Sequence, residues 1–398
     1  MTISKKISSI APSMTLAIDA KLKQMVADGI KVYGFGAGEP DFDTPEYIRN
    51  AAIEAINKGV TRYTAAQGTM DLRKAICSKL KRENGLSYEP NQIIASSGAK
   101  HSLSNAFAAI LNPGDEVIVP VPYWVSYSEI IKLNDGVPTF VQTKKENNFK
   151  ITREELEKAI TPKTKAILLN TPSNPTGAVY SEQELRDIAE VAVTKNLYVV
   201  SDEIYERLVY GGKKHISIAS LGEDIKELTI IINGMSKAYA MTGWRLGYAA
   251  GNEKIIKAMS SVQSHAVSHP SSITQYASTV ALNGPQDDVH KMVAEFEKRS
   301  IYMYERINSI EGLSCNKPEG AFYVYADISY YLGKELCGVK LESSLDFAQV
   351  MLEKGHVAVI PGAAFGTDNY IRLSYATSMD IIKNGLDVFE SFIKENLK

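Results

Sequence analysis

The sequence predicts an α/β fold, with a mostly parallel central sheet covered by helices and a smaller α+β domain attached to it. From Gln92 onward, short apolar runs alternate with helical patterns, which is typical of a parallel sheet buried between two helical layers. After Pro285 the charge density rises, and a long helical pattern precedes three further strand-like runs. The chain has 398 residues, 44% of them hydrophobic, which is enough for a large core and two domains.

Six strands and the helices between them make up the expected large domain. The strands are expected at 93–96, 116–119, 138–142, 166–170, 197–201 and 229–233. Helices are expected between most of them, at 101–111, 152–160 and 181–195. Because ligands of such sheets collect beyond the carboxyl ends of the strands, the functional site should lie at that edge.

The two ends of the chain are expected to form the smaller domain together. The N-terminal part is predicted to hold a helix at 14–29, a short strand at 32–35 and a helix with Pro45 at its first position. The C-terminal part is predicted to hold a helix at 288–309, strands at 320–325, 357–360 and 370–374, and a final helix from Met379. We therefore divide the chain into an N-terminal segment 1–45 that joins the small domain, a large domain 46–287 and a small domain 288–398.

Composition and charge argue against several classes of partner. The formal net charge is -2 and the sequence pI is about 6.4, so neither nucleic acid nor an anionic membrane is an expected partner. No apolar run approaches the roughly 18 residues of a membrane span, and the N-terminus lacks the apolar core of a signal peptide. Cys77, Cys315 and Cys337 are widely spaced, which favours a reducing compartment and no thiolate metal site. We expect a cytoplasmic protein without a metal centre.

The strand expected at 229–233 leads directly to a candidate reactive lysine. The turn at Asn233-Gly234 ends the strand, so Lys237 falls just beyond it, at the edge of the sheet, among mostly apolar neighbours. Desolvation disfavours its ammonium and lowers its pKa, which is what a nucleophilic or Schiff-base lysine needs. Arg245 follows between two glycines that leave room for a ligand to approach the backbone. An isolated Ser236-Lys237 pair, however, more often marks a surface lysine after a strand.

Small or polar residues also follow three other expected strands. The small residues at 96–99 start a helix, whose free backbone N–H groups form an anion site suited to a phosphate. The loop 170–177 contains two prolines and a glycine, which fix its geometry and aim the Asn174 amide. Asp202 ends an almost wholly apolar strand, where a carboxylate is costly unless it meets a cation. Taken singly, these features also fit an ordinary turn, a helix cap or a packing solution.

In combination, these residues resemble a known family. Asn174, Asp202 with Tyr205, Ser236-Lys237 and Arg245, in this order on alternating strands, resemble the fold-type I pyridoxal-phosphate aminotransferases. The likeness extends to Gly36-Ala-Gly-Glu-Pro-Asp-Phe-Asp, Tyr123-Trp-Val-Ser-Tyr, Ser201-Asp-Glu-Ile-Tyr, Met241-Thr-Gly-Trp-Arg and Arg372-Leu-Ser-Tyr-Ala-Thr. These segments are similar to the bacterial aspartate aminotransferase branch, subgroup Ib of the class I enzymes, and the likeness covers nearly the entire chain. The resemblance implies the fold of that family.

The resemblance further implies pyridoxal 5′-phosphate as cofactor and gives each residue a role. Lys237 would hold it as a Schiff base and move a proton between substrate and cofactor. Asp202 would pair with the protonated pyridine nitrogen, while Tyr205 and Asn174 would hydrogen-bond the ring oxygen. The remaining cofactor contacts would be Trp124 stacked on the ring, Ser236, and a phosphate site made by Gly98, Ala99, Lys100 and Arg245.

Substrate contacts and a homodimer follow from the same resemblance. Tyr63 resembles a phosphate-binding tyrosine supplied across the dimer interface, which implies two copies with shared sites. Arg372 would grip the substrate α-carboxylate bidentately, with Gly38, Asn174 and Trp124 beside it. An acidic substrate needs a second cation, and in the aspartate branch a lysine at the position of Lys100 has that part. Alternatively, Lys100 only caps or solvates the helix start.

We therefore expect ping-pong transfer of an amino group from L-aspartate to 2-oxoglutarate, giving oxaloacetate and L-glutamate. An aromatic or alanine aminotransferase is the first alternative, followed by a β-lyase or decarboxylase on the same fold. A transcription factor with an aminotransferase-like effector domain would need a DNA-binding extension, and no basic recognition helix is visible. Relatives that also transaminate prephenate carry a lysine just before a Pro-Ser pair. This chain has Ile10-Ala-Pro-Ser13 instead, so prephenate is not an expected substrate.

Overall fold

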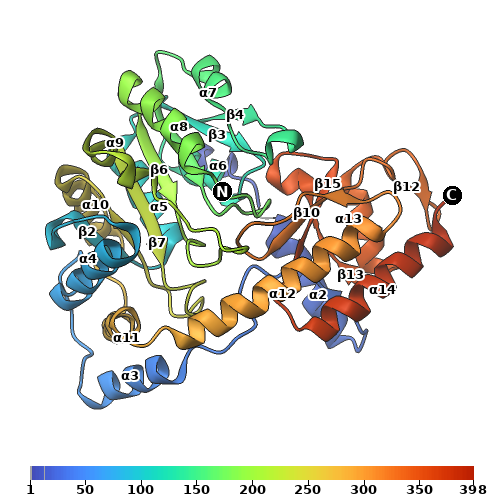
Figure 1. Cartoon of the computed structure of the whole chain (residues 1–398), viewed down its shortest axis with the longest axis horizontal. Helices are drawn as coiled ribbons and strands as arrows, with labels where there is room; N and C mark the ends of the chain where they lie inside the picture. Colours follow the sequence, from blue (N-terminus) through green and yellow to red (C-terminus); the bar gives the residue numbers. More distant parts are fainter. Residues whose placement is uncertain (1, 13) are drawn as a thin grey trace.

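The computed structural model describes residues 2–12 and 14–398, so Ser13 of the segment compared with prephenate-active relatives lies outside it. A large sheet with helices on both faces lies beside a smaller group of strands and helices (Figure 1). The long helix α12 (Asp287–Ser309) runs along both parts, and it contributes Val289 to the core of the first and Met292 to that of the second. Among the described residues, no helix combines the length and the apolar character that crossing a membrane requires.

The large sheet has seven strands in the order β2-β8-β7-β6-β5-β3-β4. Their bounds are β2 Ile93–Ser96, β3 Glu116–Val121, β4 Val137–Gln142, β5 Thr164–Asn170, β6 Tyr198–Asp202, β7 Thr229–Gly234 and β8 Gly247–Ala250. Strands β4, β3, β5, β6 and β7 run parallel to one another, whereas β8 is antiparallel to both β2 and β7. The expectation of a mostly parallel sheet is confirmed.

Alternation along each strand explains why both faces of this sheet are covered. In β7, Ile231 packs toward one helical layer, whereas Ile230 and Ile232 pack toward the other. The first layer consists of α3 (Glu46–Asn57), α4 (Met70–Asn84), α7 (Arg153–Ala159), α8 (Glu182–Lys195), α9 (Glu223–Leu228) and α11 (Ser272–Asn283). The second consists of α5 (Ala99–Ile110), α6 (Ser126–Leu133) and α10 (Glu253–Ala266).

The smaller part is built around a four-stranded sheet in the order β14-β15-β10-β9. Its strands are β9 Ser314–Cys315, β10 Tyr323–Asp327, β14 Ile360–Pro361 and β15 Tyr370–Ser374. The helices packed around it are α12, α13 (Ser344–Glu353) and α14 (Met379–Asn396). The N-terminal region adds α2 (Met14–Ala27) and β1 (Tyr33–Gly34), and β1 pairs in parallel with β13 (Val357–Ala358), whereas α1 (Lys5–Ser8) packs against α6 of the large part. A two-residue hairpin pair, β11 (Glu335–Leu336) and β12 (Val339–Lys340), completes the strands.

Two local expectations need correction, and several elements were not expected. Pro45 precedes α3 rather than starting it, because its ψ of 139° is extended and it acts as the N-cap residue. The strand expected at 357–360 is two strands, since β13 pairs with β1 whereas β14 pairs with β15. Strand β8 and helices α6, α9, α10 and α11 were not among the expected elements. The pairing of β1 with β13 supports placing that part of the N-terminal segment with the small domain, whereas α1 contacts the large domain, and the division into domains stays a prediction.

Candidate active site

A pocket opens where β5, β6 and β7 end, and it collects most of the residues predicted to be functional. Its walls come from the large sheet, the helix starts of α5 and α6, the segment 36–39, α2, and strands β10 and β15 of the small sheet. The predicted residues that line it are Gly38, Ala99, Lys100, Trp124, Asn174, Asp202, Tyr205, Ser236, Lys237, Arg245 and Arg372. Gly98 adjoins this set as the N-cap residue of α5. The edge of the sheet is therefore where the expected site lies.

Lys237 follows β7 and reaches into this pocket. Its ammonium donates a hydrogen bond to the carbonyl oxygen of Gly38. Burial lowers the pKa of Lys237 from 10.5 to about 8, and the positive charges of Arg372 and Arg245 act in the same direction. The negative charges of Glu39 and Asp202 oppose the shift without cancelling it. A substantial share of the amine is therefore neutral near physiological pH and available as a nucleophile or base.

Asp202 is the last residue of β6 and is only 3% exposed. Its two carboxylate oxygens accept hydrogen bonds from the Tyr127 hydroxyl at 2.7 Å and from the backbone N–H of Ile204 at 3.2 Å. Burial raises the pKa of Asp202 from 3.8 to about 6, although both hydrogen bonds and Lys237 act to lower it. A cation placed against this carboxylate would restore its ordinary acidity.

Tyr127 is a site residue that the sequence did not assign. It lies in the first turn of α6, and its backbone N–H donates to the carbonyl of Trp124 at 2.9 Å. The rings of Trp124 and Tyr127 meet edge to face, with centroids 5.2 Å apart. The three-residue spacing between these aromatics, one helical turn, was the available signal, but it does not reveal a carboxylate 75 residues away as the partner.

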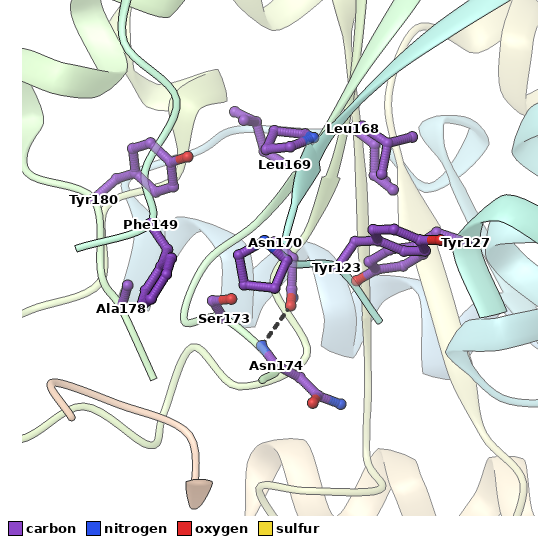
Figure 2. A pocket seen from close by; sticks show the side chains of 13 residues that line it. Tyr123, Tyr127, Phe149, Leu168, Leu169, Asn170, Ser173, Asn174, Ala178 and Tyr180 are labelled. Atoms are coloured by element: carbon purple, nitrogen blue, oxygen red, sulfur yellow. Dashed lines mark hydrogen bonds between the residues drawn. The ribbon is translucent and has the colours of Figure 1, made fainter. Parts of the chain in front are cut away.

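The loop after β5 directs Asn174 into the site. The Asn174 backbone N–H donates to the Asn170 side-chain oxygen at 2.8 Å, and the Asn170 amide donates to the Asp202 carbonyl at 3.1 Å. Figure 2 shows a small pocket lined by this loop together with apolar and aromatic side chains, with the Asn174 amide extending away from Phe149 and Tyr180. The side chains packed around this loop fix its position, and the polar end of Asn174 faces the larger pocket at the strand ends.

The start of α5 meets the chain after β7 at very short range. Gly98, the N-cap residue, has a φ of 92°, in the left-handed region that favours glycine. A Cβ on Gly98 would collide with the Arg245 guanidinium, and one on Gly247 would collide with the backbone of Gly98 and Ala99. The Arg245 guanidinium is held in turn by donation to the Thr242 carbonyl at 2.8 Å. Backbone N–H groups and a guanidinium thus converge on one spot, as an anion site requires.

Arg372 of β15 brings the small sheet into the site. Its guanidinium donates to the Asn174 side-chain oxygen at 3.0 Å and to the Gly36 carbonyl at 2.9 Å, and it lies 4.3 Å from the centroid of the Tyr323 ring. Arg372 is 3% exposed, and among the described residues its Nε has no hydrogen-bond partner. A buried guanidinium with an unused donor is suited to an incoming carboxylate.

The remaining predicted residues are placed as follows. The Lys100 ammonium lies 4.8 Å from the centroid of the Trp124 ring, and burial together with the charge of Arg245 lowers the pKa of Lys100. Tyr63 is 92% exposed and does not line the pocket as described; its ring contacts that of His269 edge to face at 5.6 Å. Ser236 is buried in the pocket wall beside Lys237.

A buried ionic network anchors the end of β6 beneath the site. Glu203 is fully buried, accepts hydrogen bonds from two serine hydroxyls, and lies 3.0 Å from His215 Nε2. Glu206 forms an ion pair with Lys79 and accepts from Asn84 at 2.9 Å. Burial raises the pKa of Glu206, but Lys79 and His215 more than offset this and bring it to about 2. Glu203 and Glu206 already accept hydrogen bonds or form ion pairs with side chains of the protein. We therefore interpret the network as structural support for Asp202 rather than as a metal centre.

The donor set of the pocket fits pyridoxal phosphate. An amine of lowered pKa matches an aldehyde, a buried carboxylate matches a protonated pyridine nitrogen, and a helix start with Arg245 matches a phosphate. The absence of a Cβ at Gly98 and Gly247 makes the room in which the phosphate-binding segments converge. The residues present are those the cofactor needs.

Comparison with known proteins gives a consistent result. The sequence model of the class I and II aminotransferases matches residues 30–389. The aspartate aminotransferase of Bacillus sp. (strain YM-2) is 49% identical over 392 residues, covering 98% of this chain and 99% of that protein. The crystal structure of the aspartate aminotransferase from Rhizobium meliloti superposes with a TM-score of 0.96 at 46% identity, covering 100% of both chains. That of Thermus thermophilus with maleate superposes with a TM-score of 0.93 at 40% identity, covering 98% of this chain and 100% of that one. The predicted fold class is confirmed.

Proposed function

Because this chain belongs to the class I and II aminotransferases, we propose that it transfers the amino group of L-aspartate to 2-oxoglutarate, giving oxaloacetate and L-glutamate. The observation that carries the choice of a dicarboxylic substrate is a pair of cations in one pocket. Arg372 presents a buried, unused donor from the small sheet, while Lys100 stands at the start of α5. Each cation can meet one carboxylate of a substrate with two.

Lys237 is proposed as the residue that exchanges the amino group and moves the proton. The cofactor, pyridoxal 5′-phosphate, supplies an aldehyde for the amino group and a ring that accepts electron density from the substrate Cα. With its pKa near 8, the Lys237 amine can take the proton from the substrate Cα and would deliver it to the cofactor carbon that receives the amino group. Its contact with the Gly38 carbonyl keeps it directed at the pocket.

The other side chains are proposed to hold the cofactor in place. Asp202 would keep the pyridine nitrogen protonated, and Tyr205 and Asn174 would donate hydrogen bonds to the ring oxygen. Trp124 would cover one face of the ring. The N–H groups of 98–100, Ser236 and Arg245 would bind the phosphate.

Arg372 is proposed to bind the α-carboxylate that all amino-acid substrates share. Its guanidinium is already oriented by Asn174 and Gly36, so little side-chain entropy is lost when a carboxylate binds. Gly38 leaves space for the substrate beside the Tyr323 hydroxyl. Binding and orientation therefore fall to Arg372, and discrimination of the distal group falls to Lys100.

A homodimer and a cytoplasmic location are also proposed. Tyr63 is 92% exposed, and α3 leaves Ile53 and Ile56 more than half exposed, which supports a second copy covering this region. Light scattering of the purified protein tests the dimer. The three cysteines are free, which supports a reducing compartment.

A panel of amino donors assayed with 2-oxoglutarate tests the proposed reaction. Aspartate should give the highest kcat/KM. Turnover should regenerate the cofactor, and the amino donor should release no CO2, ammonia or sulfide. A preference for tyrosine or alanine would assign the chain to another substrate class, and release of ammonia or sulfide would indicate a lyase. Including prephenate as acceptor checks the expectation drawn from Ala11, which stands just before the Pro-Ser pair.

Replacing Lys100 tests the origin of the dicarboxylate preference. Lys100→Ser removes the distal cation, so kcat/KM for aspartate and glutamate should fall by about 1–3 kcal/mol. Alanine and phenylalanine have no distal charge and should lose much less. Steady-state kinetics at saturating cofactor measure the ratio, with Lys254→Ser on the exposed face of α10 as control. An equal loss for all donors would assign Lys100 to the phosphate site alone.

A further inference from the structure

Tyr323 stands between the two groups that bind the cofactor oxygen and the substrate carboxylate. It belongs to β10 of the small sheet, is 1% exposed, and lines the pocket. Its hydroxyl oxygen lies 3.0 Å from that of Tyr205, and its ring lies under the guanidinium of Arg372. None of the roles given above uses this residue.

The hydroxyl contact can set the direction of the Tyr205 proton. Burial raises the pKa of both phenols, so both are neutral and one must donate to the other. The charge of Arg372 lowers the pKa of both phenols against the effect of burial, and the pKa of Tyr205 stays raised further than that of Tyr323. Either hydroxyl can donate at this distance, and the more acidic Tyr323 is the better donor. If Tyr323 donates to the Tyr205 oxygen, the Tyr205 hydroxyl hydrogen is free to point into the pocket. The first hydrogen bond then polarises the Tyr205 hydroxyl and strengthens its own donation.

The ring contact acts on a different partner. The Arg372 guanidinium lies 4.3 Å from the Tyr323 ring centroid and 5.1 Å from that of Phe365. Strands β10 and β15 pair in antiparallel register, with Tyr323 opposite Ser374 and Tyr325 opposite Arg372, so the ring of Tyr323 is fixed by the same sheet that carries the arginine. Aromatic rings on a guanidinium fix its plane and leave its N–H edge for a carboxylate.

We propose that Tyr323 is a positioning residue with two separable parts: its hydroxyl orients Tyr205 toward the cofactor ring oxygen, and its ring orients Arg372 toward the substrate α-carboxylate. This inference rests on the proposed function, since it takes the ring oxygen and the carboxylate as the ligands of Tyr205 and Arg372. It adds a contact between the small sheet and the cofactor-binding side of the pocket.

Two substitutions separate the parts. Tyr323→Phe removes the hydroxyl and keeps the ring, whereas Tyr323→Leu removes both. A donor to the ring oxygen stabilises its ionised form and lowers the pKa of the cofactor's absorbing group. Loss of the Tyr323 hydroxyl weakens that donor, so the absorbance titration of Tyr323→Phe should shift to a higher pKa, by about two- to fivefold in proton affinity. Its Kd for maleate, an unreactive dicarboxylate, should stay within about twofold of the wild-type value.

Tyr323→Leu should show the same titration shift and, in addition, a Kd for maleate raised about five- to twentyfold, because Arg372 loses the ring beneath it. Tyr325→Phe is the matched control. It removes another buried hydroxyl of β10, bonded to Thr367, and should change neither quantity. Thermal unfolding of each variant establishes that it is folded.

The outcomes that overturn the proposal are distinct from failure of the proposed function. If the absorbance titration of Tyr323→Phe superposes on the wild-type curve, the hydroxyl of Tyr323 does not orient Tyr205. Wild-type affinity for maleate in folded Tyr323→Leu removes the role of the ring, and if that variant does not fold, Tyr323→Met with the same readout decides. If the wild-type protein binds no pyridoxal phosphate or transfers no amino group, that result contradicts the proposed function instead.

Discussion

Lys237→Ala is expected to keep the fold and to lower kcat by at least about four orders of magnitude, or about 5.5 kcal/mol. The variant loses both the amine that would hold the cofactor covalently and the base that would move the proton at the substrate Cα. Single-turnover absorbance changes with aspartate measure the loss directly. Borohydride reduction of the wild-type protein, followed by peptide mass spectrometry, should place the cofactor on Lys237 alone.

Two controls make this result decisive. Lys254→Ala changes an exposed lysine of α10 and should retain wild-type turnover. The rate at which cofactor-free protein captures pyridoxal phosphate should rise with pH with its midpoint near the Lys237 pKa of about 8, rather than near 10.5, and level off about one pH unit above that midpoint. A reduced adduct on Lys100 or Lys254 would remove Lys237 from its proposed role.

Asp202→Asn is expected to lower kcat by about two orders of magnitude or more, roughly 3 kcal/mol. The substitution keeps the shape but removes the charge that would hold the pyridine nitrogen protonated. The local hydrogen bonds can survive, because the Ile204 N–H can still donate to the amide oxygen and the Tyr127 hydroxyl can turn to accept from the amide nitrogen. Steady-state kinetics at saturating cofactor are the measurement, and a loss under about threefold would show that the ring nitrogen is held by another group.

The same variant should be more stable than the wild type in the absence of cofactor. The folded protein raises the pKa of Asp202 from 3.8 to about 6, so it binds this proton more tightly than the unfolded chain does. Folding is therefore penalised once the carboxyl must ionise: the penalty is absent below pH about 4, grows through about 6, and is then constant at up to about 3 kcal/mol. Denaturant unfolding of cofactor-free protein should show Asp202→Asn gaining that much at pH 7.5. A gain that is the same at pH 4.5 would contradict this origin.

The parts of the fold that could be predicted are those in which local pattern and burial coincide. Strands such as β6 and β7 are short, apolar and flanked by helices, so their position and parallel pairing followed from the sequence. Strand β8 was missed because Gly247-Tyr-Ala-Ala lacks the β-branched residues that mark a strand, and it owes its place to packing against the start of α5.

The candidate site was foreseen where it depends on strand ends and on family motifs, and missed where it depends on long-range contacts. Lys237 and Asn174 lie just beyond strand ends and Asp202 is the last residue of its strand, which is where ligands of such sheets bind. The contacts of Tyr127 with Asp202 and of Tyr323 with Tyr205 join residues 75 and 118 positions apart. The hydrophobic periodicity of a sequence does not indicate which side chains meet across such sequence separations.

The pairing of β2 with β8 has a consequence for how the protein is made. Ile93 pairs with Ala250, and Gly247 lies against the backbone of Gly98 and Ala99, so the start of α5 is framed by residues translated long after it. Arg372 is translated later still. A growing chain on the ribosome therefore cannot assemble a cofactor pocket from its N-terminal half, and its exposed strand edges must wait for partners from the second half. The cofactor-binding residues are consequently complete only once the chain through Ala250 has been made, and the substrate-binding arginine follows later still.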